Sequence, residues 1–319
     1  MTTAEKQEAN RLTITALESG IDYPDLKSAP DEPLLIQVVD SGPDILAELS
    51  VKFEVDLEDL QDIQDLDERP RLQIEDKFVM VVLRVPVDLE GEDREYSTNP
   101  IGLFTNGRDI ILVQNKEIPL RKRRLKGVLR RTTTVSGVIY NTWEIVIHSF
   151  ETMLDIIEAT IHDTEDQILK ELYPSQLDRF FQLSRDAIYM EAALKSNMKV
   201  LRQMKRLQSF GRLVLDEDRL EELEVDLQQQ MELSLIYRTL ISNAMDQYDS
   251  IVGHNLNRVM KTLTSISLLV SVPTLIASIY GMNVDLPLEQ NPLAFVVVVL
   301  ASLIITTPLL IFLRLKGLV

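Results

Sequence analysis

The sequence has no cysteine, and its 319 residues include only one tryptophan and three histidines. The lack of cysteine excludes disulfide bonds, thiolate metal sites and cysteine nucleophiles, and it fits a reducing compartment. Zinc prefers nitrogen and sulfur ligands, so a zinc site would depend on the histidines. These are His148, His162 and His254, all in predicted helices, where a structural or surface role is the simpler interpretation.

Positive charge is scarce as well. The chain has 33 Lys and Arg against 50 Asp and Glu, which gives a formal net charge of −17. This acidic balance argues against a nucleic-acid partner and is consistent with the handling of cations. The sequence also lacks a P-loop, a Ser/His/Asp set and a metalloprotease helix motif. We therefore predict that the protein is not an enzyme and uses no organic cofactor.

Two long runs without a charged residue lie near the C-terminal end, at about 263–280 and 293–313. Each has about 18–21 residues, which is enough to cross a lipid bilayer as a helix. The linker 281–292 is too short to form a domain, so we expect a helical hairpin with both outer ends on one side. The alternative, a pair of buried helices in a soluble protein, fits poorly with two uncharged runs of this length.

Basic residues flank this hairpin only at its outer ends. Arg258 and Lys261 precede the first run, Arg314 and Lys316 follow the second, and the linker has no Lys or Arg. Cytoplasmic flanks of membrane helices carry an excess of these residues. The pattern therefore predicts a multi-pass protein of the cytoplasmic (inner) membrane with both termini in the cytoplasm and the linker outside.

The predicted fold class is an α+β membrane protein, with an N-terminal cytoplasmic α/β domain and a long stalk helix that continues into the first of two C-terminal transmembrane helices. About 260 residues precede the hairpin, enough for a domain with its own core. The expected divisions are a flexible arm, the α/β domain, cytoplasmic helices with the stalk, and the transmembrane pore domain, at 1–32, 33–134, 135–258 and 259–319.

The α/β domain is predicted from alternating or continuous apolar segments bounded by turn residues. Two short amphipathic helices are expected within 40–68, and Asn106-Gly107 is typical of a hairpin turn. The expected strands are 34–39, 71–74, 78–87, 101–105 and 110–114.

From about residue 135 the pattern is helical almost throughout, with helices predicted at 135–171, at 175–208 and from Asp216 onward. No proline follows Asp216 until Pro273, so the third helix is predicted to run from the cytoplasm into the membrane. A helix of this length needs partners, and self-association around an axis would supply them. Apolar residues of this helix recur at steps of three and four, as in a coiled-coil seam: Leu220, Leu223, Leu227, Met231 and Leu235.

One basic cluster is formed by Arg121-Lys122-Arg123-Arg124 together with Lys126, Arg130 and Arg131. Two interpretations stay open. The cluster is either a solvated helix face that pairs with acidic helices of a neighbour, or a contact with anionic lipid head groups.

Hydroxyl side chains recur on one face of the first apolar run. They are Thr264, Ser267, Ser271, Thr274 and Ser278, at steps of three and four. The same steps upstream give Met260, Asn257, Gly253, Ser250 and Asp246. A stripe of small polar groups that faces the axis of an oligomer would line a wet path, whereas the alternative is dry packing of small residues between helices. The polar continuation upstream favours the pore.

The first apolar run ends at Tyr280-Gly281-Met282-Asn283. This motif, at the end of the first of two C-terminal membrane helices, resembles that of the CorA-type magnesium/cobalt ion channel (transporter) family. The resemblance covers about 257–313 closely and the rest of the chain only in layout. The upstream residues that carry it are Asn257, Val259-Met260-Lys261, Leu263-Thr264, Thr274, Ile276-Ala277 and Ile279.

The resemblance implies a homopentamer that passes Mg²⁺, and often Co²⁺ or Ni²⁺, down its gradient, with Mg²⁺ bound between cytoplasmic domains favouring the closed state. It implies a hydrophobic gate at Met260 and Leu263, with Thr274 and Asn257 on the conduction path and Asp246 in the cytoplasmic vestibule. It places the selectivity filter at Gly281, Met282 and Asn283. It also makes four acidic residues candidate regulatory ligands: Asp88, Glu221, Glu222 and Asp226.

The filter has a physical rationale in the hydration of the ion. Mg²⁺ sheds its waters reluctantly, so a ring of neutral amide oxygens from Asn283 suits it by accepting hydrogen bonds from the first-shell waters. Gly281 is expected to let the chain turn sharply after the helix, and Tyr280 to brace that turn. Asp285 and Glu289 in the outer loop either raise the local cation concentration or are ordinary solvated loop residues.

Some positions depart from the family pattern. Ser278 stands where glycine is common, and the outer loop reads Leu286-Pro287-Leu288-Glu289. Two alternatives therefore remain. One is a Zn²⁺ or Co²⁺/Ni²⁺ transporter on the same scaffold. The other is a non-transporting, membrane-tethered cation sensor, which would still work after Asn283→Ala.

Overall fold

The computed structural model describes residues 12–40, 42–89, 95–115, 132–170, 173–207, 209–210, 213–284, 286–287 and 292–318. The chain divides into two compact units, Met1–Ala244 and Met245–Val319. The first contains an α/β domain and a helical bundle, and the second contains two apolar helical segments.

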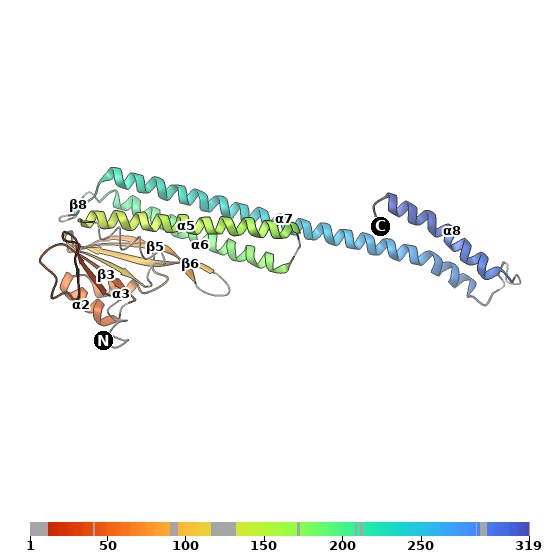
Figure 1. Cartoon of the computed structure of the whole chain (residues 1–319), viewed down its shortest axis with the longest axis horizontal. Coiled ribbons are helices and arrows are strands. Elements are labelled where there is room, and N and C mark those ends of the chain that lie inside the picture. Colours follow the sequence, from red (N-terminus) through yellow and green to blue (C-terminus); the bar gives the residue numbers. More distant parts are fainter. Residues whose placement is uncertain are drawn as a thin grey trace. The chain divides into compact units, whose positions relative to one another are not determined.

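The first unit contains a seven-stranded sheet with the order β2-β1-β3-β7-β6-β5-β4. Three of its strands, β3, β5 and β6, are labelled in Figure 1. β3 and β7 pair in parallel, and the other neighbours are antiparallel. The strands are β1 (Leu12–Ala16), β2 (Asp22–Tyr23), β3 (Leu34–Val39), β4 (Arg71–Ile74), β5 (Val79–Leu89), β6 (Glu95–Thr105) and β7 (Ile110–Gln114). β3 to β7 match the predicted strands, with β5 and β6 extended.

The first two strands differ from the expectation for this part of the chain. Residues 12–23 were expected to belong to a flexible arm, but they form β1 and β2, and Ile14 is fully buried. The short stretch Leu12–Ala16 alternates apolar and hydroxyl side chains, and pairing with β3 makes this marginal pattern a stable strand.

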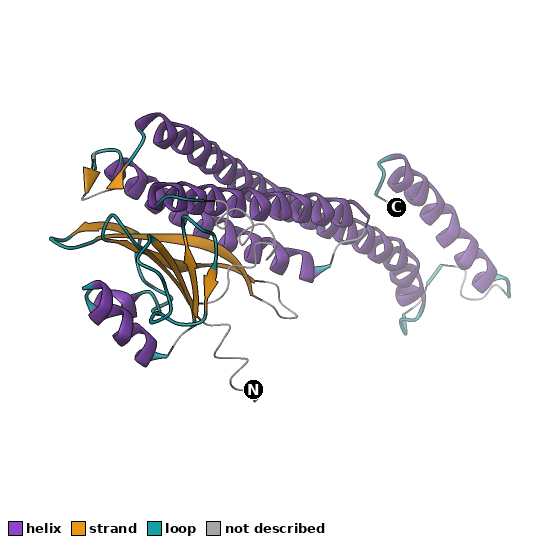
Figure 2. Cartoon of the chain, turned by 60° about the vertical axis from the view of Figure 1, so that its left-hand side comes forward, coloured by secondary structure: helices purple, strands orange, loops and turns teal. Residues whose placement is uncertain are grey.

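Helices cover both faces of the sheet (Figure 2). α2 (Pro43–Phe53) and α3 (Leu57–Asp62) lie on one face, where Leu46, Leu49 and Leu60 join the apolar core with strand residues such as Ile36 and Phe104. α5 (Val135–Lys170) and α6 (Pro174–Met204) pack on the other face against β5, and α6 also packs against β4 and β6. The predicted helix pair and the two long helices are confirmed.

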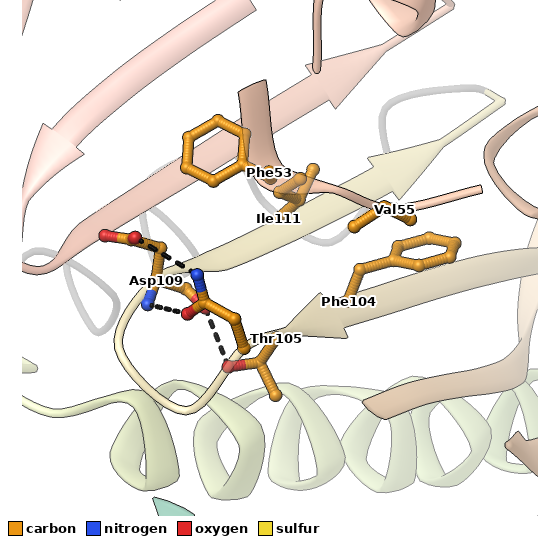
Figure 3. A pocket seen from close by; sticks show the side chains of 7 residues that line it. Phe53, Val55, Phe104, Thr105, Asp109 and Ile111 are labelled. Atoms are coloured by element: carbon orange, nitrogen blue, oxygen red, sulfur yellow. Dashed lines mark hydrogen bonds between the residues drawn. The ribbon is translucent and has the colours of Figure 1, made fainter. Parts of the chain in front are cut away.

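The β6–β7 turn closes one end of the core, as predicted from Asn106-Gly107. Gly107 takes a φ of +86°, which glycine adopts without strain. Asn106 Oδ1 accepts a hydrogen bond from the Asp109 amide at 2.8 Å, and Thr105 Oγ1 donates to the Asp109 carbonyl at 2.7 Å (Figure 3). A small hollow beside this turn is lined mainly by apolar side chains. Its one carboxylate, Asp109, already accepts from the Leu34 amide at 3.0 Å, so the hollow is part of the core packing.

One side chain joins α6 to the edge of the sheet. The pairing of β4 with β5 ends at Val82, and Asn197 of α6 takes the place of a strand partner two residues further on. Asn197 Oδ1 accepts from the Arg84 amide at 2.9 Å, and Nδ2 donates to the Arg84 carbonyl at 2.8 Å. The guanidinium of Arg84 donates to the carbonyls of Glu68 and Leu66, and its burial lowers the pKa of Arg84.

α7 (Glu217–Tyr280) is a single helix of 64 residues that ends at the predicted residue. The hairpin of β8 (Ser209–Phe210) and β9 (Leu213–Val214) precedes it. In the first unit the buried face of α7 follows strict steps of three and four: Leu220, Leu223, Leu227, Gln230, Ser234, Tyr237, Ile241 and Ala244. The predicted seam is correct up to Leu227. Met231 and Leu235 lie off it, because successive steps of four rotate around the helix, and Leu235 is 46% exposed.

Candidate cation pathway

Two helical segments of the second unit are long and apolar enough to cross a membrane, the end of α7 and α8 (Ala294–Leu315). Only 6% and 11% of the respective spans is buried inside the protein. The core helices of a soluble protein would be mostly buried, so these values favour a membrane environment over the soluble alternative.

α8 turns back beside the last part of α7 (Figure 1). On α7 the less exposed residues recur at steps of four and three: Ser265, Leu269, Val272 and Ile276. On α8 they are Ala294, Val298, Ser302, Thr306, Leu309 and Leu313. Ser265 is 3% exposed and Ser302 is 9% exposed. We infer that α7 and α8 pack on each other through these two faces.

The predicted hydroxyl stripe lies on a different side of α7. Thr264, Ser267, Ser271, Thr274 and Ser278 are all exposed. At about 100° per residue, the centre of this stripe lies about 150° around the helix from the α8-facing residues. The stripe therefore faces away from α8, and α8 does not bury these hydroxyls.

The hydroxyl groups of the stripe have a defined orientation. Thr264 Oγ1 donates to the Met260 carbonyl at 2.8 Å, Ser271 Oγ to the Ser267 carbonyl at 2.7 Å, and Thr274 Oγ1 to the Val270 carbonyl at 2.8 Å. Each of these protons is used within the helix, so the hydroxyl oxygen offers lone pairs to its surroundings. This surface accepts hydrogen bonds, which suits the outward-pointing protons of water bound to a cation.

The other predicted pathway residues of α7 are also exposed. Asp246 and Asn257 lie upstream on the continuation of the stripe, and Met260 and Leu263 are 52% and 57% exposed. At the far end Met282 and Asn283 are exposed beyond the last turn of the helix. All the described pathway residues are thus uncovered by their own chain.

Gly281 closes the helix end in a way that differs from the expectation. Its amide donates to the Ala277 carbonyl at 3.0 Å, and the Met282 amide donates to the Ile279 carbonyl at 3.2 Å. Gly281 does not take a positive φ. A Cβ atom there would lie 3.3 Å from the Ala277 carbonyl oxygen, so the absence of a side chain relieves a close backbone contact rather than permitting a left-handed turn.

Several predicted residues lie outside the part that the structure describes. Asp285 and Glu289 of the outer loop are among them, as is the whole basic cluster at 121–131. Asp88 lies in β5, opposite Tyr96 of β6, but its side chain is outside the description.

The regulatory candidates on α7 do not form a metal site within one chain. Glu221, Glu222 and Asp226 are exposed, and Glu221 lies 3.4 Å from Lys205 at the C-terminal cap of α6. Among the described residues no group of three His, Asp or Glu side chains is placed to hold a metal ion. The sequence pattern did not identify Glu224 as a candidate residue. Hydrogen bonds from Arg202 at 2.8 Å and Lys205 at 3.0 Å lower the pKa of Glu224.

The histidines offer little for a zinc site. His148 Nδ1 lies 2.9 Å from Glu151, and His162 Nδ1 lies 3.6 Å from Glu165, each within one turn of α5. His254 is exposed on α7. The three are far apart along the chain, in agreement with a surface role.

The helical hairpin was predicted, but the face of α7 that packs on α8 was not. Serine and threonine occur on both faces of α7, and the stripe was identified by its regular steps alone. The available signal was Ser265, which breaks the regular spacing of the hydroxyl stripe. Leu269, Val272 and Ile276 follow Ser265 at helical steps, and together they mark the second face of α7.

Comparison with known proteins gives consistent matches along nearly the whole chain. A cobalt/magnesium transport protein CorA of Methanocaldococcus jannaschii is 25% identical over 279 residues, which cover 85% of this chain and 86% of that protein. A protein of the same name from Thermotoga maritima is 22% identical over 241 residues, covering 71% of this chain and 66% of that one.

The fold agrees with these matches. The complete structure of the CorA magnesium transporter from Methanocaldococcus jannaschii aligns with a TM-score of 0.83 and 23% identity, covering 97% of this chain and 99% of that one. The sequence profile described as CorA-like Mg²⁺ transporter protein matches residues 36–315. The chain therefore belongs to the family of CorA-like Mg²⁺ transporter proteins.

Proposed function

We propose that copies of this chain assemble around an axis, as a homopentamer, into a channel that passes hydrated Mg²⁺, and also Co²⁺ or Ni²⁺, across the cytoplasmic membrane. One observation carries the proposal: the hydroxyl face of α7 is exposed, lies away from α8 and leads to the exposed Asn283. Family membership supports Mg²⁺ as the substrate, and the two relatives are named for cobalt and magnesium transport.

In this channel the amide oxygens of Asn283, one from each subunit, accept hydrogen bonds from the first-shell waters of the ion. Mg²⁺ then enters without losing its waters, which would be slow. Gly281 and Met282 hold this ring at the helix end, and the hydroxyl face continues the acceptor surface inward. Asp285 and Glu289 in the outer loop raise the cation concentration at the mouth.

The gate and its regulation lie toward the cytoplasm. Rings of Met260 and Leu263 close the path by excluding water, and Asn257 and Asp246 follow on the cytoplasmic side. Mg²⁺ bound between neighbouring cytoplasmic domains favours the closed state, with ligands from Asp88, Glu221, Glu222 and Asp226. Glu221, Glu222 and Asp226 are exposed and belong to no metal group among the described residues of one chain, which suits a site completed by a second chain.

The proposal is tested by Mg²⁺ entry into liposomes that carry the purified wild-type protein and a Mg²⁺-sensitive dye. Under an inward Mg²⁺ gradient we expect dye signal well above that of protein-free liposomes. Crosslinking in detergent should give species up to a pentamer. A protein that admits no Mg²⁺ under a gradient would rule out the channel, and a stable monomer would rule out assembly around a shared axis.

The orientation of α7 is tested by single cysteines, because the chain has none of its own. Ser271→Cys is expected to react with a water-soluble, positively charged thiol reagent and to lose most of its Mg²⁺ flux, since the adduct fills the path. The matched control is Ser265→Cys on the α8-facing side of the same helix, which is 3% exposed and should keep its flux. Equal block at both positions, or none at Ser271, would place the hydroxyl face off the path.

A further inference from the structure

The buried seam of α7 has a polar interruption. Gln230 and Ser234 are 5% and 0% exposed, and they lie between the apolar residues Leu227 and Tyr237. Gln230 Oε1 and Ser234 Oγ have no hydrogen-bond partner among the described residues. The two residues are four apart, so they occupy adjacent turns of the same helix face.

Ser234 differs from other hydroxyls in the bundle. Those hydroxyls typically donate to the carbonyl four residues earlier in their own helix, as do Thr142, Ser149, Thr164, Ser196 and Thr239. No such bond holds Ser234. A buried oxygen without a partner loses its hydrogen bonds to water and gains none in return. The seam is therefore weakened over one full turn.

α7 is fastened to its neighbours on both sides of this turn. On the N-terminal side, Glu224 pairs with Arg202 of α6 and with Lys205 at its C-terminal cap, and Arg219 lies 3.2 Å from Glu144 of α5.

On the C-terminal side, Arg238 lies 3.2 Å from Glu191 of α6. Burial, followed by a hydrogen bond to Glu158 of α5 and the negative charges of Glu158 and Asp155, raises the pKa of Tyr237 to about 12. Tyr237 is thus a neutral donor over the physiological range. The weakened turn lies between two sets of polar and ionic attachments.

We propose that residues 228–236 of α7 are a built-in weak point, which opens locally from α5 and α6 while the attachments at 219–224 and at 237–238 stay closed. Local openings of a native protein begin where the folded state is stabilised least. The opening lets the long helix bend or shift between its attachments without loss of the bundle. The opening requires neither a particular transported ion nor a particular number of subunits.

Hydrogen–deuterium exchange of the full chain in detergent micelles tests the proposal. Peptides within 228–236 are expected to exchange at least about tenfold faster than peptides within 217–227 and 237–244. The double variant Gln230→Leu/Ser234→Ala should slow exchange in 228–236 by about tenfold or more, because apolar side chains of similar size need no partner. The matched control is Gln229→Leu/Ser242→Ala, which alters the same residue types at exposed positions of the same helix.

Ser234→Ala alone removes one oxygen and adds no volume, so it tests the idea even if the leucine at 230 packs badly. It should also slow exchange in this segment. Uniform exchange along 217–244 in the wild-type protein, or unchanged or faster exchange in Ser234→Ala, would overturn the proposal.

Discussion

Asn283→Ala is expected to lower Mg²⁺ flux into liposomes by about tenfold or more, while the protein still assembles and enters the membrane. A hydrogen bond contributes about 0.5–1.5 kcal/mol, and every subunit loses one such acceptor at the same level of the path. A loss of about 1.4 kcal/mol in the stabilisation of the ion there already corresponds to about a tenfold lower rate. Asn283 is exposed beyond the end of α7, so its removal leaves no cavity in the fold.

The control for this result is Asn291→Ala, which removes the same amide from the same linker. Its flux should stay within about twofold of wild type, since ordinary loop amides contribute little. Asn283→Asp keeps an oxygen acceptor at this position and adds a negative charge. A ring of carboxylates should bind divalent ions more tightly and release them more slowly. Full Mg²⁺ flux in Asn283→Ala would show that the ring of Asn283 amides is not the selectivity filter.

Asn197→Leu is expected to destabilise the first unit by about 2–4 kcal/mol, because it leaves the Arg84 amide and carbonyl without their partner. Asn197 is fully buried, so water does not replace the lost hydrogen bonds. For a unit of this size the change corresponds to a fall of about 5–15 °C in melting temperature. Thermal unfolding of the full chain in detergent, followed by circular dichroism, measures it.

Ser196→Ala is the control for Asn197→Leu. Ser196 is the preceding residue in α6, and its hydroxyl donates to the Ala192 carbonyl of its own helix. Its removal should change the stability by less than about 0.5 kcal/mol. A melting temperature of Asn197→Leu equal to that of Ser196→Ala would mean that the link between α6 and β5 adds nothing to stability.

Long periodic features of the fold were predictable from the sequence. α7 was predicted through Tyr280 because neither a proline nor a break interrupts its pattern before Pro273. The family match confirms both the resemblance and the assignment to a transporter rather than an enzyme. β1 and β2 were missed because such short strands become stable only through their partners, β1 by pairing with β3 and β2 by pairing with β1, and local pattern does not encode these pairings.

Local sequence pattern identifies the candidate pathway residues of α7 but not the tertiary contacts of α6 and α7. The stripe and Asn283 follow from spacing and motif; the structure shows that they are exposed, and their role in a cation pathway stays a prediction. The partnership of Asn197 with Arg84 joins residues 113 apart in sequence, and the seam of α7 depends on which neighbour each turn meets. Neither can be derived from local periodicity, because both are set by tertiary contacts.

The hydroxyl protons of Thr264, Ser271 and Thr274 donate within α7, and this affects whether cations or anions can pass along the face. Water bound to a cation points both hydrogens outward, whereas water bound to chloride directs one of its hydrogens at the anion, so a hydrated anion offers fewer donors to this face. In an assembly where the face lines the path, the hydroxyl oxygens favour hydrated cations over hydrated anions without a fixed charge on the wall.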